Sequence, residues 1–302
     1  MRQLFLPVFL LLLLPLIVEA QADRLQEELA AFAGNYRAQI GIAVIIDHMD
    51  TVLVNNRADY PLLSVFKFHQ ALAVINHLHR KGISLDEQIH IRRKELLPDT
   101  YSPLRDSFPE GDVTLPVREL LRYTMQQSDN NACDILFRRF GGVRATERYI
   151  RSLGMNDVVI RYNEEQMHRN IMRCYANCTS PLDAVGLIEY VRTHELPEQE
   201  YLEYIFSLME TCATGSDRLA APLLHTQVVF GHKTGTGDRN AQGLLIAVND
   251  IGYVWRLPNF HSYSIAVFVK DSSESPEATV AIVAGISERV YRFVNALPSL
   301  SM

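Results

Sequence analysis

The sequence predicts an α/β domain built from both ends of the chain, with an all-helical domain inserted between the two halves. Apolar runs typical of strands occur in residues 40–54 and again in residues 228–269, while helical periodicity dominates the stretch between them. A long amphipathic helix closes the chain. We therefore expect the following division: residues 21–60 and 209–302 in the α/β domain, and residues 61–208 in the helical domain.

The first segment of the chain predicts export. Arg2 supplies a positive charge, and an almost wholly apolar stretch follows from Leu4 to Val18. Small residues at positions 18, 20 and 22 fit a cleavage site, so residues 1–20 are expected to be a signal peptide. The alternative is an uncleaved anchor, which the shortness of the stretch and its two prolines disfavour. We expect a periplasmic protein with no membrane association after cleavage.

The first folded elements after this segment are a helix and two strands. Residues Arg24 to Tyr36 carry apolar side chains at helical spacing. The run Ile40–Ile46 is almost entirely apolar, and a short turn separates it from Thr51–Val54. Two such strands joined by a short turn are expected to pair with each other.

The middle of the chain is predicted to be mainly helical. The first helix is expected to start at Ser64. Four further helices are expected over Val117–Met125, Ala132–Phe140, Ala145–Leu153 and Ser180–Thr193. Glycines follow the second and the third of these four, as they do at many helix C-termini. Ser180 has the residue type of an N-cap, and Pro181 suits the first turn. Residues 157–179 are rich in charge and low in periodicity, which predicts a long loop.

The last third returns to strands. The predicted strands are Val228–Gly235, Gly243–Val248 and Tyr263–Val269, and Asn249–Gly252 has the residue types of a hairpin turn. The helix Glu277–Asn295 has apolar side chains at helical spacing. With the two N-terminal strands, these make five strands in the α/β domain.

Composition excludes several classes of partner. The formal net charge is −6 and no long basic block occurs, which argues against nucleic acid and anionic membranes as partners.

The four cysteines form no CxxC pair and no zinc pattern, and we expect neither a metal nor a cofactor. Cys133 and Cys212 are expected to be buried thiols, whereas pairing of Cys174 with Cys178 stays open.

Ser64 and Lys67 form the first candidate for chemistry. In a helix, positions three residues apart share a face, so this hydroxyl and this amine would meet. A lysine inside the apolar run that follows Ser64 is unusual, because an unpaired ammonium is costly to bury. Ser64 is therefore a candidate nucleophile and Lys67 a candidate base. The alternative is that Ser64 caps the helix while Lys67 extends to solvent.

Two further motifs strengthen this interpretation. Ser128-Asp129-Asn130 precedes a predicted helix, and Lys233-Thr234-Gly235 ends a predicted strand. S-x-x-K, S-D-N and K-T-G in this order form the motif set of class A β-lactamases and penicillin-binding proteins. Over nearly the whole mature length, the chain resembles a class A serine β-lactamase.

The resemblance implies a fold and a set of roles. The fold would be an antiparallel five-stranded sheet flanked by terminal helices, with the inserted helical domain forming one wall of the site. The catalytic residues would be Ser64 as nucleophile, Lys67 as base, Ser128 as proton donor to the lactam nitrogen and a loop glutamate for deacylation. The substrate-binding residues would be Asn130, Lys233, Thr234, Gly235, Thr236, Tyr101 at the mouth and Arg218 as a second cation. Arg218 is equally compatible with a structural ion pair. The resemblance also implies a monomer that binds small β-lactam substrates.

The loop glutamate separates a hydrolase from an acyl-enzyme trap. Glu164 and Glu165 both have the right side chain, and we select Glu164 because its spacing to His168 matches the spacing usual in the family. Residues 157–179 would then be the omega-type loop. Glu165, His168 and Asp134 each depart from the commonest pattern of the family. These departures resemble a cephalosporinase or extended-spectrum subgroup with an altered loop, and Asp134 is predicted to hold that loop.

The expected function is hydrolysis of β-lactam antibiotics, with cephalosporins favoured, through a serine acyl-enzyme that a glutamate-activated water resolves. Such an enzyme would confer β-lactam resistance. Two alternatives stay open: a DD-peptidase or transpeptidase, which would remain acylated, and a non-catalytic β-lactam sensor domain. Whether Lys67 or Glu164 takes the proton from Ser64 also stays open.

Overall fold

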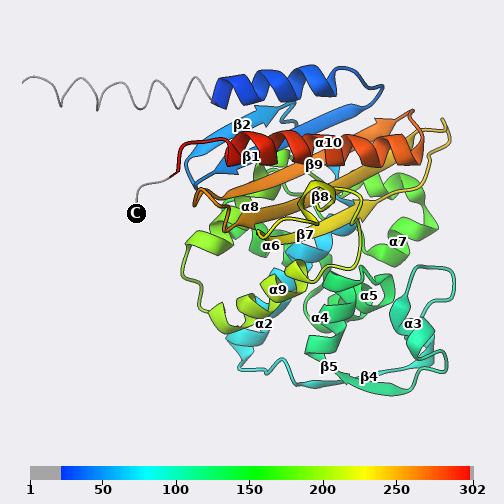
Figure 1. Cartoon of the computed structure of the whole chain (residues 1–302). Coiled ribbons are helices and arrows are strands. Elements are labelled where there is room, and N and C mark those ends of the chain that lie inside the picture. The colour runs from blue at the N-terminus through cyan, green and yellow to red at the C-terminus, as the bar shows by residue number, and fades with distance from the viewer. Residues whose placement is uncertain (1–21, 300–302) are drawn as a thin grey trace, which may run out of the picture.

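The computed structural model describes residues 22–299, so the predicted signal peptide lies outside the described residues. Within this range, no helix combines the length and the apolar character that crossing a membrane would need. The described chain forms a five-stranded sheet with helices on both faces (Figure 1).

The sheet joins strands from the two ends of the chain. Its order is β2-β1-β9-β8-β7, and every neighbouring pair is antiparallel. The strands are β1 (Gln39–Ile46), β2 (Asp50–Val54), β7 (Val229–Thr236), β8 (Leu245–Trp255) and β9 (Tyr263–Ser272). The predicted antiparallel five-stranded sheet is therefore confirmed. Its edge strand β7 carries the Lys-Thr-Gly motif at its C-terminal end.

Two terminal helices cover one face of the sheet (Figure 1). They are a helix over residues 22–33 and α10 (Pro276–Asn295). Their apolar stripes meet the residues of β1 that point to this face, such as Ile42 and Val44. The alternate residue Ala43 belongs instead to the core on the opposite face. This alternation follows from the two-residue period of a strand.

The other face of the sheet meets the helical part of the molecule. Helix α8 (Pro181–Thr193) packs against β1 and β9, and α9 (Gln199–Glu210) packs against β7. The remaining helices are η1 (Leu63–Val65), α2 (Phe66–Lys81), η2 (Arg93–Glu95), α3 (Pro103–Ser107), α4 (Val117–Gln126), α5 (Asn130–Arg139), α6 (Gly142–Ser152), α7 (Glu164–Arg169), η3 (Ile171–Ala176) and η4 (Ala221–Leu223). Short strand pairs β3 (Tyr60–Pro61) with β6 (Cys178–Thr179) and β4 (Gln88–Ile91) with β5 (Val113–Pro116) complete the fold.

Local signals set several of these boundaries. Ser180 caps α8 by accepting a hydrogen bond from the Asp183 amide, as its residue type predicts. Asp129 caps α5 through the Ala132 amide, so this helix begins at Asn130, two residues before the predicted start. The loop predicted over residues 157–179 contains a short helix, α7, which Asn163 caps. Helix α9 has no counterpart among the predicted helices.

The predicted hairpin turn at Asn249–Gly252 is wrong. These residues lie in the middle of β8, which runs unbroken to Trp255. Asn249 and Asp250 are fully buried, and each has tertiary partners: Asn249 donates to the Pro61 carbonyl at 2.6 Å, and Asp250 accepts from the Leu219 amide at 3.2 Å. Polar residues that favour turns when exposed are tolerated inside a strand when such partners satisfy them.

Candidate active site

Ser64 and Lys67 meet at the junction of η1 and α2. Lys67 Nζ donates to Ser64 Oγ at 3.0 Å, and the lysine side chain is fully buried. Ser64 caps neither helix, because the cap positions are Leu62 and Val65. The alternative in which Lys67 extends to solvent is therefore wrong.

Buried Lys67 is surrounded by acceptors from three other elements. Its Nζ lies 2.7 Å from the Ser128 carbonyl, 2.6 Å from Asn130 Oδ1 and 2.9 Å from Glu164 Oε1. A buried amino group is tolerated when it is hydrogen-bonded and has an acidic partner, and these contacts supply both conditions. The Lys67 side chain, which comes from α2, thus contacts α7, α5 and the loop that precedes α5.

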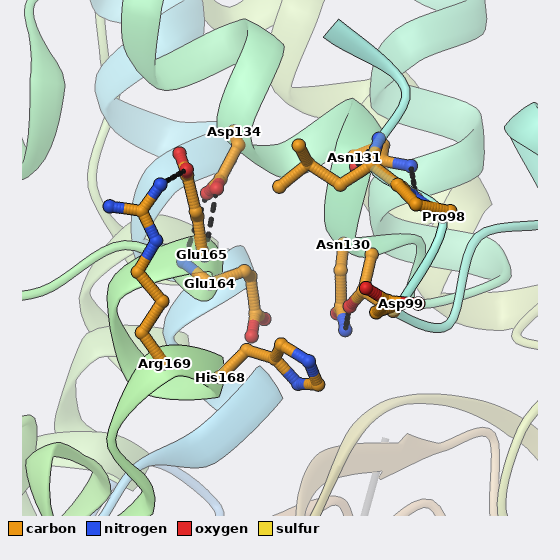
Figure 2. A pocket seen from close by; sticks show the side chains of 11 residues that line it. Pro98, Asp99, Asn130, Asn131, Asp134, Glu164, Glu165, His168 and Arg169 are labelled. Carbon is orange, nitrogen blue, oxygen red and sulfur yellow. Dashed lines mark hydrogen bonds and ion pairs between the residues drawn. The ribbon is translucent and has the colours of Figure 1, made fainter. Parts of the chain in front are cut away.

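Glu164 is the loop glutamate that reaches the serine. Its Oε1 lies 3.4 Å from Ser64 Oγ as well as next to Lys67. Glu165 points away and pairs with Arg169 on the next turn of α7 (Figure 2). The geometry therefore separates the two glutamates, and it favours Glu164.

Asp134 holds the start of α7. Its two carboxylate oxygens accept hydrogen bonds from the Glu164 and Glu165 amides, each at 2.9 Å (Figure 2). The predicted contact between Asp134 and the loop is thus confirmed, through backbone amides of the loop. Burial, and then repulsion from the Glu164 carboxylate, raise the pKa of Asp134 to about 7. His168, Asp134 and Glu164 line one small cavity (Figure 2).

Ser128 lies between the two motif lysines. Lys233 Nζ donates to Ser128 Oγ at 3.0 Å, and Lys67 Nζ lies 3.5 Å from the same hydroxyl. Ser128 has a φ of +59°, a left-handed backbone conformation that few non-glycine residues adopt. Lys233 is fully buried; burial, together with repulsion from Lys67, lowers its pKa to about 8.

The end of β7 lies directly beside the serine. A Cβ on Gly235 would lie 2.9 Å from the Leu62 carbonyl and 3.4 Å from the Ser64 amide, so a side chain here would push the two segments apart. The Thr234 hydroxyl lies 2.7 Å from that of Thr214. Thr236, the residue after the Lys-Thr-Gly motif, is exposed and lines a cavity together with Ser64.

Arg218 lies beneath this strand end. It is only 7% exposed and donates to Thr236 Oγ1 at 2.6 Å and to the Gly235 carbonyl at 2.9 Å. The side chain therefore reaches the cavity through the Thr236 hydroxyl, and its ion pair with Asp217 is long, at 4.0 Å. Tyr101 is 58% exposed, and its carbonyl accepts from the Asn130 amide at 3.1 Å.

These side chains surround a cavity of about 260 Å³, which Ser64, Asn130, Glu164, His168 and Thr236 all line. A smaller cavity of about 180 Å³ shares Asn130, Glu164 and His168 with it (Figure 2). Among residues 22–299, no group of three or more His, Cys, Asp or Glu side chains could hold a metal ion.

The sequence interpretation missed several residues that hold this site in place. Thr100 accepts from Asn130 Nδ2 at 2.8 Å, and Asn177 bonds three backbone groups of residues 161 and 162. His232 is buried, and its Nδ1 lies 3.0 Å from Asp250 Oδ1. No spacing rule relates these residues, because only tertiary packing brings them together.

The cysteines also differ in part from expectation. All four are free thiols, so Cys174 and Cys178 do not pair. Cys133 is buried as expected, whereas Cys212 is partly exposed. The reason for the exposure of Cys212 is its place in the loop after α9.

A comparison with known protein families shows which family has this arrangement of residues. Residues 24–294 match the model of the β-lactamase enzyme family. The chain belongs to that family. Among its relatives, a β-lactamase of Phocaeicola vulgatus is 42% identical over 279 residues, which cover 92% of this chain and 85% of the relative. The extended-spectrum β-lactamase PER-1 of Pseudomonas aeruginosa is 32% identical, covering 93% and 91%.

Solved structures agree with this β-lactamase assignment. The TLA-1 extended-spectrum β-lactamase superposes with a TM-score of 0.87 at 37% identity, covering 91% of this chain and 99% of that one. A class A β-lactamase of Bacteroides cellulosilyticus gives 0.86 at 37% identity, covering 92% and 99%. The protein is thus a class A serine β-lactamase, a hydrolase of β-lactams.

Proposed function

We propose that this β-lactamase works through a Ser64 acyl-enzyme, that Glu164 activates the deacylating water, and that cephalosporins are its favoured substrates. We further propose that it acts as a monomer in the periplasm and confers β-lactam resistance. The observation that supports the mechanism best is the position of Glu164, whose carboxylate contacts both Ser64 Oγ and Lys67 Nζ.

Acylation would begin when Ser64 Oγ attacks the lactam carbonyl. Lys67 and Glu164 both lie within reach of its proton, at 3.0 and 3.4 Å, so either can accept it. The backbone amides of Ser64 and Thr236 are the candidate oxyanion donors. As the carbonyl–nitrogen bond breaks, Ser128 would give its proton to the lactam nitrogen. It would be resupplied through Lys67 or Lys233, both in contact with its hydroxyl.

Deacylation would reverse these roles with water as the nucleophile. Glu164 would take a proton from the water as its oxygen attacks the ester carbonyl, and the Ser64–acyl bond would then break to restore the hydroxyl. Asp134 would orient the glutamate, because it fixes the amide of that same residue.

The substrate carboxylate would bind at the end of β7. Lys233 supplies the cation there, Thr234 and Thr236 supply hydroxyls, and Arg218 adds charge through Thr236. Asn130 would bind a substrate amide. Tyr101 stands exposed at the mouth of the cavity, next to Asn130.

The preference for cephalosporins rests on the altered loop and on the relatives. PER-1 and TLA-1 are named extended-spectrum β-lactamases, and this chain is similar to both. Steady-state turnover of a penicillin, a first-generation cephalosporin and an oxyimino-cephalosporin tests the preference. We expect the highest kcat/KM on a cephalosporin, and a pure penicillinase profile would contradict the proposal.

The proposed binding site for the substrate carboxylate predicts that kcat/KM depends on pH. Lys233 is charged below its pKa of about 8 and loses its charge as the pH rises through that value. The kcat/KM should therefore fall above about pH 8, approaching tenfold per pH unit if only the charged lysine binds the substrate. Arginine stays charged throughout this range, so Lys233→Arg should move the decline to higher pH, although its absolute rate will be lower. The same decline in wild type and variant would remove Lys233 as its cause.

The contact between Asp134 and the loop predicts the effect of substituting Asp134. Asp134→Asn keeps the size of the side chain but offers one acceptor oxygen to two amides, so one buried N–H loses its partner. We expect a loss of about 1–3 kcal/mol in the free energy of unfolding and a lower kcat. Thermal denaturation and steady-state kinetics measure both, with exposed Asp157→Asn as the matched control. If the two variants behave alike, Asp134 does not hold Glu164 in place.

A further inference from the structure

A buried carboxylate that has no part in the reaction described above lies beside the end of β7. Asp250 is on β8, directly opposite Thr234 in the strand register, and it is fully buried. Its carboxylate has partners on two sides. Both oxygens lie 3.0 Å from His232 Nδ1, and Oδ2 accepts a hydrogen bond from the Leu219 amide at 3.2 Å. A buried carboxylate is costly unless it is paired, so these partners indicate which segments it holds together.

His232 contacts Asp250 from β7. Burial disfavours a charged imidazole, but the Asp250 carboxylate outweighs this effect and raises the pKa of His232 to about 10. Neighbouring residues of a strand point to opposite faces, so His232 faces Asp250 whereas Lys233 faces Ser128. The histidine thus orients the carboxylate without entering the group of reacting side chains.

The second partner of Asp250 belongs to the segment that carries Arg218. The Leu219 amide, which Asp250 binds, directly follows Arg218 in the chain. The Arg218 guanidinium donates to the Asn249 carbonyl at 3.0 Å and to Thr236 Oγ1 at 2.6 Å. Two consecutive residues of β8 therefore hold the arginine, one through its side chain and one through the amide that follows it.

Arg218 is also a buried cation and needs a negative charge nearby. Burial lowers the pKa of Arg218, and Asp250 is the strongest of the groups that oppose this change. The other acid near the guanidinium, Asp217, lies 4.0 Å away with a side chain that is 67% exposed. Solvent weakens such an exposed pair. Asp250 therefore supplies the buried charge that stabilises the guanidinium next to Thr236.

We propose that Asp250 is a positioning residue for substrate binding, which keeps Arg218 in contact with Thr236 and acts on the substrate carboxylate through that arginine. His232 is part of the arrangement, because it orients Asp250. The inference rests on the role proposed for Arg218 and Thr236 in binding the substrate carboxylate.

Asp250→Asn removes the charge and keeps the size of the side chain. We expect the KM of a cephalosporin with a free carboxylate to rise about tenfold while kcat changes less than about threefold, because the lost interaction contributes to binding and not to the chemical step. Steady-state kinetics of the purified mature protein measures both. An unchanged KM in a folded Asp250→Asn variant would overturn the proposal.

The methyl ester of the same cephalosporin separates positioning from general damage to the fold. It lacks the anionic group that Arg218 would bind, so the kcat/KM of the wild type and of Asp250→Asn on the ester should agree within about twofold. An equal loss of kcat/KM on the acid and on the ester would show that Asp250 only supports the fold, which would contradict the proposal.

Arg218→Gln tests whether Asp250 acts through the arginine. Effects of two residues that work through one contact do not add, so Asp250→Asn should lower kcat/KM by less than about twofold further when Arg218→Gln is already present. A further tenfold loss would mean that Asp250 acts by another route. A loss in Arg218→Gln without one in Asp250→Asn would overturn this inference alone. Wild-type binding by Arg218→Gln would overturn the proposed role of Arg218, and the inference with it.

Asp47 provides the matched control. It also pairs with a buried histidine, His261, and it accepts from the Ser262 amide at 2.8 Å. This pair lies at the end of the sheet remote from Thr236. Asp47→Asn should therefore leave the KM within about twofold of the wild type, even where it lowers the melting temperature.

A second variant decides if Asp250→Asn does not fold. His232→Asn removes the imidazole that orients Asp250 and leaves the carboxylate in place. We expect its KM to rise by at least about threefold on the free acid, with no loss of kcat/KM on the ester. A KM like that of the wild type would contradict the proposal.

Discussion

Glu164→Gln is expected to give an enzyme that acylates but scarcely deacylates. The amide keeps the shape of the side chain yet cannot take a proton from water, so kcat should fall by about 10²- to 10⁴-fold. Intact-protein mass spectrometry after mixing with a cephalosporin should then show the acyl adduct accumulating to nearly one per chain.

The neighbouring glutamate provides the control. Glu165 has the same side chain and a place on the same turn of α7, but it pairs with Arg169 and not with the reacting groups. Glu165→Gln should therefore turn over at close to the wild-type rate without a lasting adduct. Unchanged turnover in Glu164→Gln would remove Glu164 from the mechanism.

Lys67→Ala is expected to slow the formation of the acyl-enzyme by about 10²- to 10⁴-fold, the usual effect of losing a proton acceptor. The variant also removes the partner of the Glu164 carboxylate and a donor to the Ser128 carbonyl. Rapid mixing followed by acid quench and mass measurement gives the acylation rate directly. A rate close to the wild type would show that Lys67 is dispensable for this step.

The two variants together address which group takes the proton from Ser64. If Glu164→Gln acylates at the wild-type rate while Lys67→Ala does not, Lys67 is the base. If both variants acylate slowly, the proton passes through Glu164 as well. The distances allow either path, since both groups lie within 3.4 Å of the serine hydroxyl.

The sequence predicted the reacting residues of the site better than the residues that hold them in place. Ser64 and Lys67 are found together because helical spacing brings residues three apart onto one face. Ser128 and Lys233 are distant in the chain, and only the motif set related them before the structure did. Glu164 could be preferred over Glu165 by its spacing to His168, and the structure places the two carboxylates in opposite directions.

The sheet was predictable for a similar reason, because four of its strands are bounded by ordinary turn residues. The part of strand β8 from Asn249 onward was not, since Asn249 and Asp250 have the composition of a turn and are satisfied inside the sheet by residues far away in the sequence. Likewise, His232 and Asp250 become a pair only because β7 pairs with β8. Local propensity carries no information about such contacts.

The most direct test of the mechanism follows one turnover of the wild-type protein. Purified mature protein is mixed with an equimolar cephalosporin, quenched at intervals, and analysed by intact mass and peptide mapping. The mechanism predicts an adduct on Ser64 that appears first and disappears as hydrolysed product forms. An adduct that persists without product would indicate a transpeptidase-like protein or a sensor, and loss of substrate with an adduct on another residue would contradict the role of Ser64.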